Sequence, residues 1–168
     1  AADLDAQISL LSDKWPDAKY LAYFQSHTNT YAPADELRSK FYAALEHPQV
    51  SGIAIATRPD SIPDDVLDLL SELNKKTFLW VELGLQTIHE ESARYIRRGY
   101  NNDVYYDAVN RLNKAGIFTV THIIIGLPNE DADMVVETTK KAVDAGTHGI
   151  KFHLLHILRG TDLQKEYE

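Results

Sequence analysis

The stretch that decides the fold is WVELGLQTIHEESARYIRRGY, residues 80–100. It opens as a strand in which an apolar series alternates with a carboxylate, a glycine and an amide: Val81, Leu83 and Leu85 against Glu82, Gly84 and Gln86. Successive side chains of a strand point to opposite faces, so the apolar series packs against helices and the second series faces elsewhere. That second face predicts a ligand site in which Gly84 leaves room, although Glu82 could equally pair with an Arg or His of a neighbouring strand.

Four more apolar runs flank this strand, and segments with helical spacing separate them. The predicted strands are residues 20–24, 52–57, 78–85, 118–126 and 149–157. The predicted helices are residues 3–14, 33–45, 63–73, 104–115 and 132–145, with Gly116 and Gly146 just past two helix ends. Because strands and helices alternate, the pattern predicts an α/β fold with a parallel sheet, either a barrel or a doubly wound sheet.

Composition limits the possible functions. The 168 residues suit one domain, and the net charge of −8 argues against strong binding of nucleic acid or anionic membranes by this chain alone. No apolar run approaches the ~20 residues that span a bilayer, so no membrane partner and a cytoplasmic location are predicted. The chain has no cysteine, which excludes disulfides and iron–sulfur ligation within it.

Polar residues follow every predicted strand, where parallel α/β folds carry their functional groups. His122 shares the parity of Gly126, so we expect it to face the interior of a barrel. His153 and His156 are three residues apart and point to opposite faces of a strand, so a shared metal ion is not predicted.

Five phrases in order carry a family resemblance. They are YLAYFQSHTNTY (20–31), GIAIATRPDSIPDDVLDLL (52–70), WVELGLQTIHEESARYIRRGYN (80–101), THIIIGLPNED (121–131) and GIKFHLLHILRGTDL (149–163). They resemble the radical S-adenosylmethionine (SAM) superfamily, in particular the branch near the Elongator catalytic subunit and the YhcC/YtqA-like proteins.

The resemblance implies a partial (βα)6 TIM-like barrel in which the five parallel strands are the second to the sixth. The first strand and the CxxxCxxC loop, which holds a [4Fe–4S] cluster and leaves one iron open for SAM, are expected before Asp3. Residues 1–168 are therefore expected to be a radical SAM core domain truncated at both ends, with its cluster ligands outside this chain. A relative without a cluster is the alternative.

The resemblance also implies which polar residues bind SAM. Thr28 and Asn29 match the segment that receives the amino group, while Glu82 and Gln86 match positions near the ribose and the methionyl group. Arg98 matches an arginine that pairs with the SAM carboxylate in coproporphyrinogen-oxidase relatives, with Arg97 as its competitor. A guanidinium fork suits a carboxylate.

Further positions are implied around the nucleoside. Residues 123–126, including Gly126, and Leu127 match a backbone strip that flanks adenine, and Leu155 matches an apolar neighbour of the ring. Some close relatives have a Glu where Ala56 stands, so Thr57 or Asp60 is expected to replace its ribose contact.

The implied function is that of a radical SAM enzyme core, an oxidoreductase or a transferase. An electron, supplied to the cluster by a reductase, would cleave SAM to a 5′-deoxyadenosyl radical. Elongator-like relatives act on tRNA, which makes tRNA a possible substrate through segments outside this chain. The alternatives are a cluster-less SAM- or nucleoside-binding module, and a barrel lyase or aldolase that uses Glu82, His122 or Lys151 as acid or base.

Overall fold

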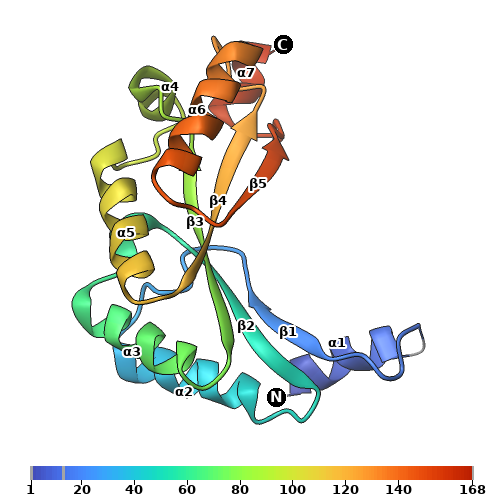
Figure 1. The fold of residues 1–168 in the computed structure, drawn as a ribbon. Coiled ribbons are helices and arrows are strands. Elements are labelled where there is room, and N and C mark those ends of the chain that lie inside the picture. The colour runs from blue at the N-terminus through green and yellow to red at the C-terminus, as the bar shows by residue number, and fades with distance from the viewer. Residues whose placement is uncertain (1, 13, 168) are drawn as a thin grey trace.

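A five-stranded parallel sheet, curled into a half-barrel, forms the centre of the computed structural model, which describes residues 2–12 and 14–167 (Figure 1). Its strands lie side by side in chain order: β1 (Tyr20–Phe24), β2 (Val50–Thr57), β3 (Phe78–Gln86), β4 (Phe118–Ile125) and β5 (Gly149–Leu154). Each neighbouring pair is parallel. The predicted partial barrel of five parallel strands is confirmed, and the doubly wound alternative is wrong.

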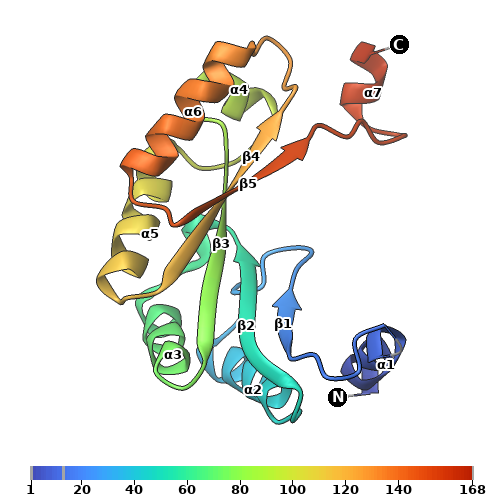
Figure 2. The same cartoon turned by 45° about the vertical axis from the view of Figure 1, so that its right-hand side comes forward.

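Helices cover one face of this sheet and leave the concave face open (Figures 1 and 2). The covering helices are α2 (Ala34–Leu45), α3 (Asp64–Asn74), α5 (Asn102–Lys114) and α6 (Ala132–Asp144). Helix α1 (Ala2–Ser12) lies beyond the β1 edge, and α7 (Asp162–Tyr167) lies beyond the β5 edge (Figure 2). None of the described helices is long and apolar enough to cross a bilayer.

The sequence patterns miss two short elements, the 3-10 helix η1 (Pro59–Ser61) and α7. The helix expected at the end of residues 81–100 is present but short, as α4 (Glu90–Tyr95). Six residues or fewer are too short to show a helical period. The fifth strand is shorter than predicted and ends at Leu154. Its neighbour β4 stops at Ile125, where Gly126 turns away with φ of 91°, so few partners remain for residues 155–157.

Two helix ends are fixed by glycine, as predicted. Gly116 follows α5 with φ of 70°, and Gly146 follows α6 with φ of 92°. Both values lie in the left-handed region that residues with a Cβ rarely adopt. The chain can therefore leave each helix sharply and enter β4 or β5 within a few residues.

Strand parity separates the core from the open face. The predicted apolar series of β3 is fully buried: Leu79, Val81, Leu83 and Leu85. It packs in one cluster with residues of the covering helices, among them Phe41, Leu69 and Val109. Glu82 and Gln86 belong to the opposite series of β3, which faces the concave side.

We expect the same substitution to have different effects at the centre of the sheet and at its β5 edge. Leu83→Ala should lower the free energy of unfolding by about 2–5 kcal/mol, because Leu83 is 0% exposed and truncation leaves a cavity. Leu154→Ala should change it by less than about 0.5 kcal/mol, because Leu154 is 67% exposed. Urea unfolding followed by tryptophan fluorescence measures both, and equal losses would contradict the assignment of Leu83 to the core.

Candidate functional site

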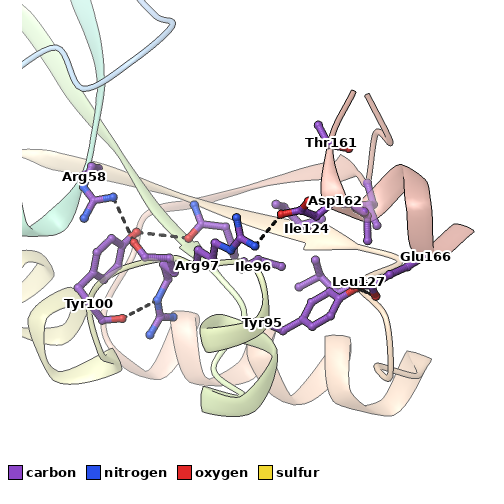
Figure 3. Close-up of a pocket in the computed structure, with 14 residues that line it drawn as sticks. Arg58, Tyr95, Ile96, Arg97, Tyr100, Ile124, Leu127, Thr161, Asp162 and Glu166 are labelled. Carbon is purple, nitrogen blue, oxygen red and sulfur yellow. Dashed lines mark hydrogen bonds and ion pairs between the residues drawn. The ribbon is translucent and has the colours of Figure 1, made fainter. Parts of the chain in front are cut away.

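A cavity of about 480 Å³ lies at the C-terminal ends of β3, β4 and β5, between α4 and α7 (Figure 3). Its wall combines an amide from β3 with apolar side chains from β4 and from the segments that follow β4 and β5: Gln86, Ile124, Leu127 and Leu155. Arginines and a tyrosine also line it: Arg58, Arg97, Arg98 and Tyr100. The segments at α4 and α7 supply the rest of the wall: Tyr95, Ile96, Thr161, Asp162, Leu163 and Glu166. The size is in the range of small-molecule sites, which run from about 300 to 1,000 Å³.

Gln86 is held in an unusual conformation at the end of β3. Its φ is 64°, and the register with β4 shifts between Gly84 and Gln86. A Cβ added at Gly84 would lie 2.3 Å from Gln86 Nε2, so the glycine makes room for the Gln86 amide rather than directly for a ligand. Tyr100 donates to Gly84 O at 2.6 Å and contacts Gln86 Oε1 at 3.3 Å. Burial raises the pKa of Tyr100 to about 12, which keeps this donor protonated.

Arg98 has a different role from the one expected. Its side chain is 2% exposed. Nε donates to Tyr100 O, while Nη1 lies within 3.0 Å of three oxygens, the carbonyls of Leu85 and Thr87 and Asn102 Oδ1. The expected two-point fork toward a carboxylate is therefore not available from these nitrogens. Nη2 makes no hydrogen bond to the described residues but forms an ion pair with Glu90 Oε2 at 3.6 Å, and Arg98 lines the cavity.

Two other arginines contribute to the cavity wall. Arg97, the competitor of Arg98, is 79% exposed at its side chain and pairs with Asp162 of α7 at 2.8 Å. Arg58 forms two hydrogen bonds with Asp60 and packs over the Tyr100 ring at 4.9 Å. Sequence patterns do not point to Arg58 or Tyr100 as cavity residues, because both lie in turns where no periodicity applies.

The predicted residues at the ends of β1 and β2 lie outside this cavity wall. The Asn29 amide donates to Ala56 O, and Asp60 pairs with Arg58. The Thr57 and Thr30 hydroxyls share a buried hydrogen bond of 2.6 Å. Thr28 accepts at its backbone oxygen from Tyr31 N and also does not line the cavity. These groups hold the two strand ends together, and their expected contacts with SAM stay predictions.

The apolar part of the wall agrees more closely with the expected adenine side. Ile124, Leu127 and Leu155 line the cavity. Gly126 is placed beside Leu155, since a Cβ added there would lie 3.9 Å from the Leu155 Cβ. Ile124 and Leu127 lie toward α7, beside Asp162 and Glu166, while Arg58 and Tyr100 lie on the opposite side of the cavity (Figure 3).

Glu82 lies below the cavity and is fully engaged by protein groups. Its Oε2 accepts from Tyr23 at 2.6 Å, His122 Nε2 at 2.6 Å and Lys151 Nζ at 3.2 Å, and its Oε1 accepts from Trp80 at 2.9 Å. Lys151 also donates to the Tyr23 hydroxyl at 2.8 Å. We call these five residues the carboxylate hub. The expected contact between Glu82 and SAM is not available here, and the pairing with a neighbouring histidine is the arrangement found.

Electrostatics keep the hub in one protonation state. Burial raises the pKa of Glu82, but hydrogen bonds from Tyr23, His122, Trp80 and Lys151 outweigh burial and lower it. Burial lowers the pKa of His122 and outweighs the opposite effect of Glu82. An ionised carboxylate only accepts, so the neutral His122 ring carries its proton on Nε2. His122 faces the interior, as predicted from its parity.

Comparison with known proteins gives the family. The family model described as the Radical SAM superfamily matches residues 1–142. The chain belongs to the radical SAM superfamily. It is 54% identical over 158 residues to YtqA of Bacillus subtilis, a match that covers 94% of this chain and 49% of YtqA. It is 38% identical over 151 residues to YhcC of Escherichia coli, covering 89% of this chain and 49% of YhcC.

A solved structure supports the fold. The archaeal Elp3 of Methanocaldococcus infernus superposes with a TM-score of 0.81 at 19% identity, covering 98% of this chain and 43% of that one. At that identity the likeness shows the fold alone. The chain spans about half the length of the curated relatives it matches.

Radical SAM proteins generally use SAM and a [4Fe–4S] cluster, and the residues present fit only the first of these. The cavity offers both apolar and polar groups, as a zwitterionic nucleoside requires. No cysteine is present to hold the cluster. No group of three or more His, Cys, Asp or Glu in residues 2–12 and 14–167 is arranged to hold a metal ion.

The hub makes stability depend on pH through Glu82. Glu82→Gln should lower the free energy of unfolding at pH 7 by about 3–5 kcal/mol, because Lys151 loses its charged partner. The folded pKa lies below the ordinary value of 4.5, so the stabilisation is complete above pH 4.5 and is lost as the pH falls through the folded pKa. Urea titrations between pH 8 and pH 3 should therefore show the difference from wild type shrinking toward acid.

Glu72→Gln is the matched control for this experiment. Glu72 pairs with Arg38 and Lys76 on the exposed side of the helices. We expect a much smaller loss at pH 7 than for Glu82→Gln, because solvent screens this pair. A Glu82→Gln difference that stays constant from pH 8 to pH 3 would contradict the lowered pKa.

Proposed function

We propose that this chain is the SAM-binding core of a radical SAM enzyme. The observation that carries the proposal is the cavity at the C-terminal ends of β3, β4 and β5, which is lined by apolar side chains together with the Gln86 amide. Ligands of parallel α/β folds bind at this end of the strands. Membership of the radical SAM superfamily supports SAM as the ligand.

The apolar and polar groups of the cavity suit the two ends of SAM. Leu127 and Leu155 would pack against the adenine ring. The Gln86 amide would donate to the methionyl carboxylate, together with Arg98 Nη2, which pairs with Glu90 at 3.6 Å but makes no hydrogen bond to the described residues. Tyr100 holds the Gln86 amide in position through its hydrogen bond with Oε1, so the donor would already be oriented before binding.

The cluster would have to come from residues outside this chain. With both groups bound, radical SAM chemistry provides a 5′-deoxyadenosyl radical that removes a hydrogen atom from a substrate. This chain would bind SAM, orient it and exclude water. We also propose a cytoplasmic enzyme with a reductase as electron donor; tRNA, through segments elsewhere in the protein, is the substrate that the Elongator resemblance favours.

The structure weighs against Glu82 as the general base of a barrel lyase or aldolase. That alternative needs Glu82, His122 or Lys151 to exchange protons with a substrate. Glu82 is 4% exposed, and four donors already occupy its carboxylate. A general base needs an open acceptor within hydrogen-bond reach of the substrate, which Glu82 lacks. A cluster-less SAM-binding module remains the second candidate, because the chain itself has no cysteine.

Binding to the cavity can be tested with a matched pair of substitutions. Leu155→Asn should weaken the binding of S-adenosylhomocysteine about tenfold, because it puts an amide among the apolar groups of the cavity. Leu158→Asn should leave the affinity unchanged, since Leu158 is exposed and does not line the cavity. Isothermal titration calorimetry measures both dissociation constants. Equal affinity in the two variants would place the ligand elsewhere.

The complete protein distinguishes an enzyme from a binding module. We expect about three cysteines in a CxxxCxxC segment upstream of this chain. After anaerobic reconstitution with iron and sulfide, the complete protein should show a [4Fe–4S] absorption spectrum and release 5′-deoxyadenosine from SAM on reduction. The 168-residue chain should do neither. A complete protein without the cysteine triad would favour the binding module.

A further inference from the structure

The carboxylate hub presents one charged group to the concave face. Glu82 is sealed at 4% exposed, whereas the Lys151 side chain is 38% exposed. The Glu82 charge is shared among hydrogen bonds from four donors. A molecule in the half-barrel would therefore meet the ammonium of Lys151 before it meets the carboxylate.

Lys151 keeps donor capacity beyond the hub. An ammonium has three donors, and the contacts of Lys151 Nζ within the described residues are the Tyr23 hydroxyl and Glu82 Oε2. The third hydrogen has room to bind an acceptor from the concave side. Tyr23 fixes the direction of the ammonium, because Lys151 Nζ also lies 4.8 Å from the centre of the Tyr23 ring.

His153 is a second group without a partner, next to Lys151. It lies two residues further along β5, so both side chains share the concave face. Its Nε2 is buried and has no hydrogen-bond partner among the described residues. The His153 ring packs against the His122 ring of the hub at 4.7 Å. A buried ring nitrogen without a partner is unfavourable unless something binds it.

The two groups lie directly below the candidate SAM cavity. His153 pairs with Ile124, which lines that cavity, and Leu155 of the cavity wall follows His153 by two residues. At about 3.3 Å per residue, Lys151 lies roughly 13 Å below Leu155 along the strand. A molecule in the half-barrel could thus touch both the hub and a ligand in the cavity.

We propose that Lys151 and His153 form an anion-binding site that holds a carboxylate or phosphate group of the substrate. This inference rests on the proposed function, which makes the concave face the place where substrate and SAM meet. The ammonium of Lys151 and a ring N–H of His153, from residues whose Cα atoms lie about 6–7 Å apart along one strand face, can donate to two oxygens of one oxyanion. The site would fix the anionic end of the substrate and leave its other end toward the cavity.

The hub explains why an anion is favoured over a cation. A cation would have to approach the exposed ammonium, while the only carboxylate of the hub is buried behind it. A neutral group would gain less, because hydrogen bonds with a charged partner are about twice as strong as neutral ones. The site therefore selects for charge, and this can be measured with small probes.

The test uses the 168-residue chain labelled with 15N-histidine and titrated in low-salt buffer. Acetate and inorganic phosphate should shift the His153 ring signals saturably, with dissociation constants roughly in the millimolar range. Acetamide, which has the shape of acetate without its charge, should not. Lys151→Met should weaken acetate or phosphate binding at least about tenfold, and Lys151→Arg should retain it. Lys76→Met, which removes a lysine from the distant helix surface, is the control.

The outcomes separate this inference from the proposed function. Tighter binding of phosphate than acetate would indicate a phosphate-bearing substrate, and the reverse a carboxylate. If acetamide binds as well as acetate in the wild-type chain, or if Lys151→Met binds acetate and phosphate as well as wild type does, the anion site is overturned. S-adenosylhomocysteine affinity of the wild-type chain is measured on the same samples and reports on the SAM cavity separately. If the wild-type chain does not bind S-adenosylhomocysteine but still binds acetate and phosphate, the proposed function is refuted and the anion site stands.

Discussion

The burial of one carboxylate, that of Glu82, constrains the whole sheet. An isolated carboxylate in this position would lose several kcal/mol of solvation, which only a full set of donors can offset. The donors come from β1, β3, β4 and β5: Tyr23, Trp80, His122 and Lys151. Strands β1 and β5 are the two edges of the sheet, yet Lys151 reaches Tyr23 at 2.8 Å. In a flat sheet with strands about 4.8 Å apart these edges would lie nearly 20 Å from each other. The sheet must therefore curl for the Glu82 carboxylate to receive all its hydrogen bonds, and these hydrogen bonds in turn hold the sheet in its curled shape.

A second set of contacts arranges the top of β3, one layer above the hub. Arg98 donates to Leu85 O and Thr87 O, which are backbone carbonyls that the shift in register leaves without regular partners. The Tyr100 hydroxyl likewise donates to Gly84 O. These hydrogen bonds hold Gln86 in its left-handed conformation. The backbone carbonyls in this part of the cavity wall are therefore already hydrogen-bonded. The hub fixes the curvature of the sheet, and the Arg98–Tyr100 pair fixes the C-terminal end of β3. Together these contacts determine the position of Gln86.

Sequence alone predicted the elements with a strong period and missed the contacts that depend on the curled shape. Alternation along β3 correctly separated Leu83 from Glu82, because side-chain direction in a strand follows from parity. The same parity placed His122 on the concave face. The partners of Glu82 were not predictable, because Tyr23 and Lys151 are 128 residues apart and meet only across the curled sheet. Arg98 was assigned to a ligand for a related reason: a buried guanidinium that binds backbone carbonyls has no signature in the sequence.

The distribution of unpaired polar atoms shows where this fold is prepared for a ligand. Buried polar groups in folded proteins are nearly all hydrogen-bonded, and each exception is unfavourable by about 1–3 kcal/mol. Among the described residues, the buried side-chain atoms without a hydrogen bond are Arg98 Nη2, His153 Nε2 and, at the far end of α5, Asn113 Oδ1. The first pairs with Glu90 at 3.6 Å and belongs to a residue that lines the candidate SAM cavity, and the second lies on the concave face directly below it. The hub next to them leaves no buried atom of its own without a hydrogen bond in the same part of the chain. A carboxylate with four donors beside a ring nitrogen without one supports the proposal that this face receives a ligand, with the hub as its support.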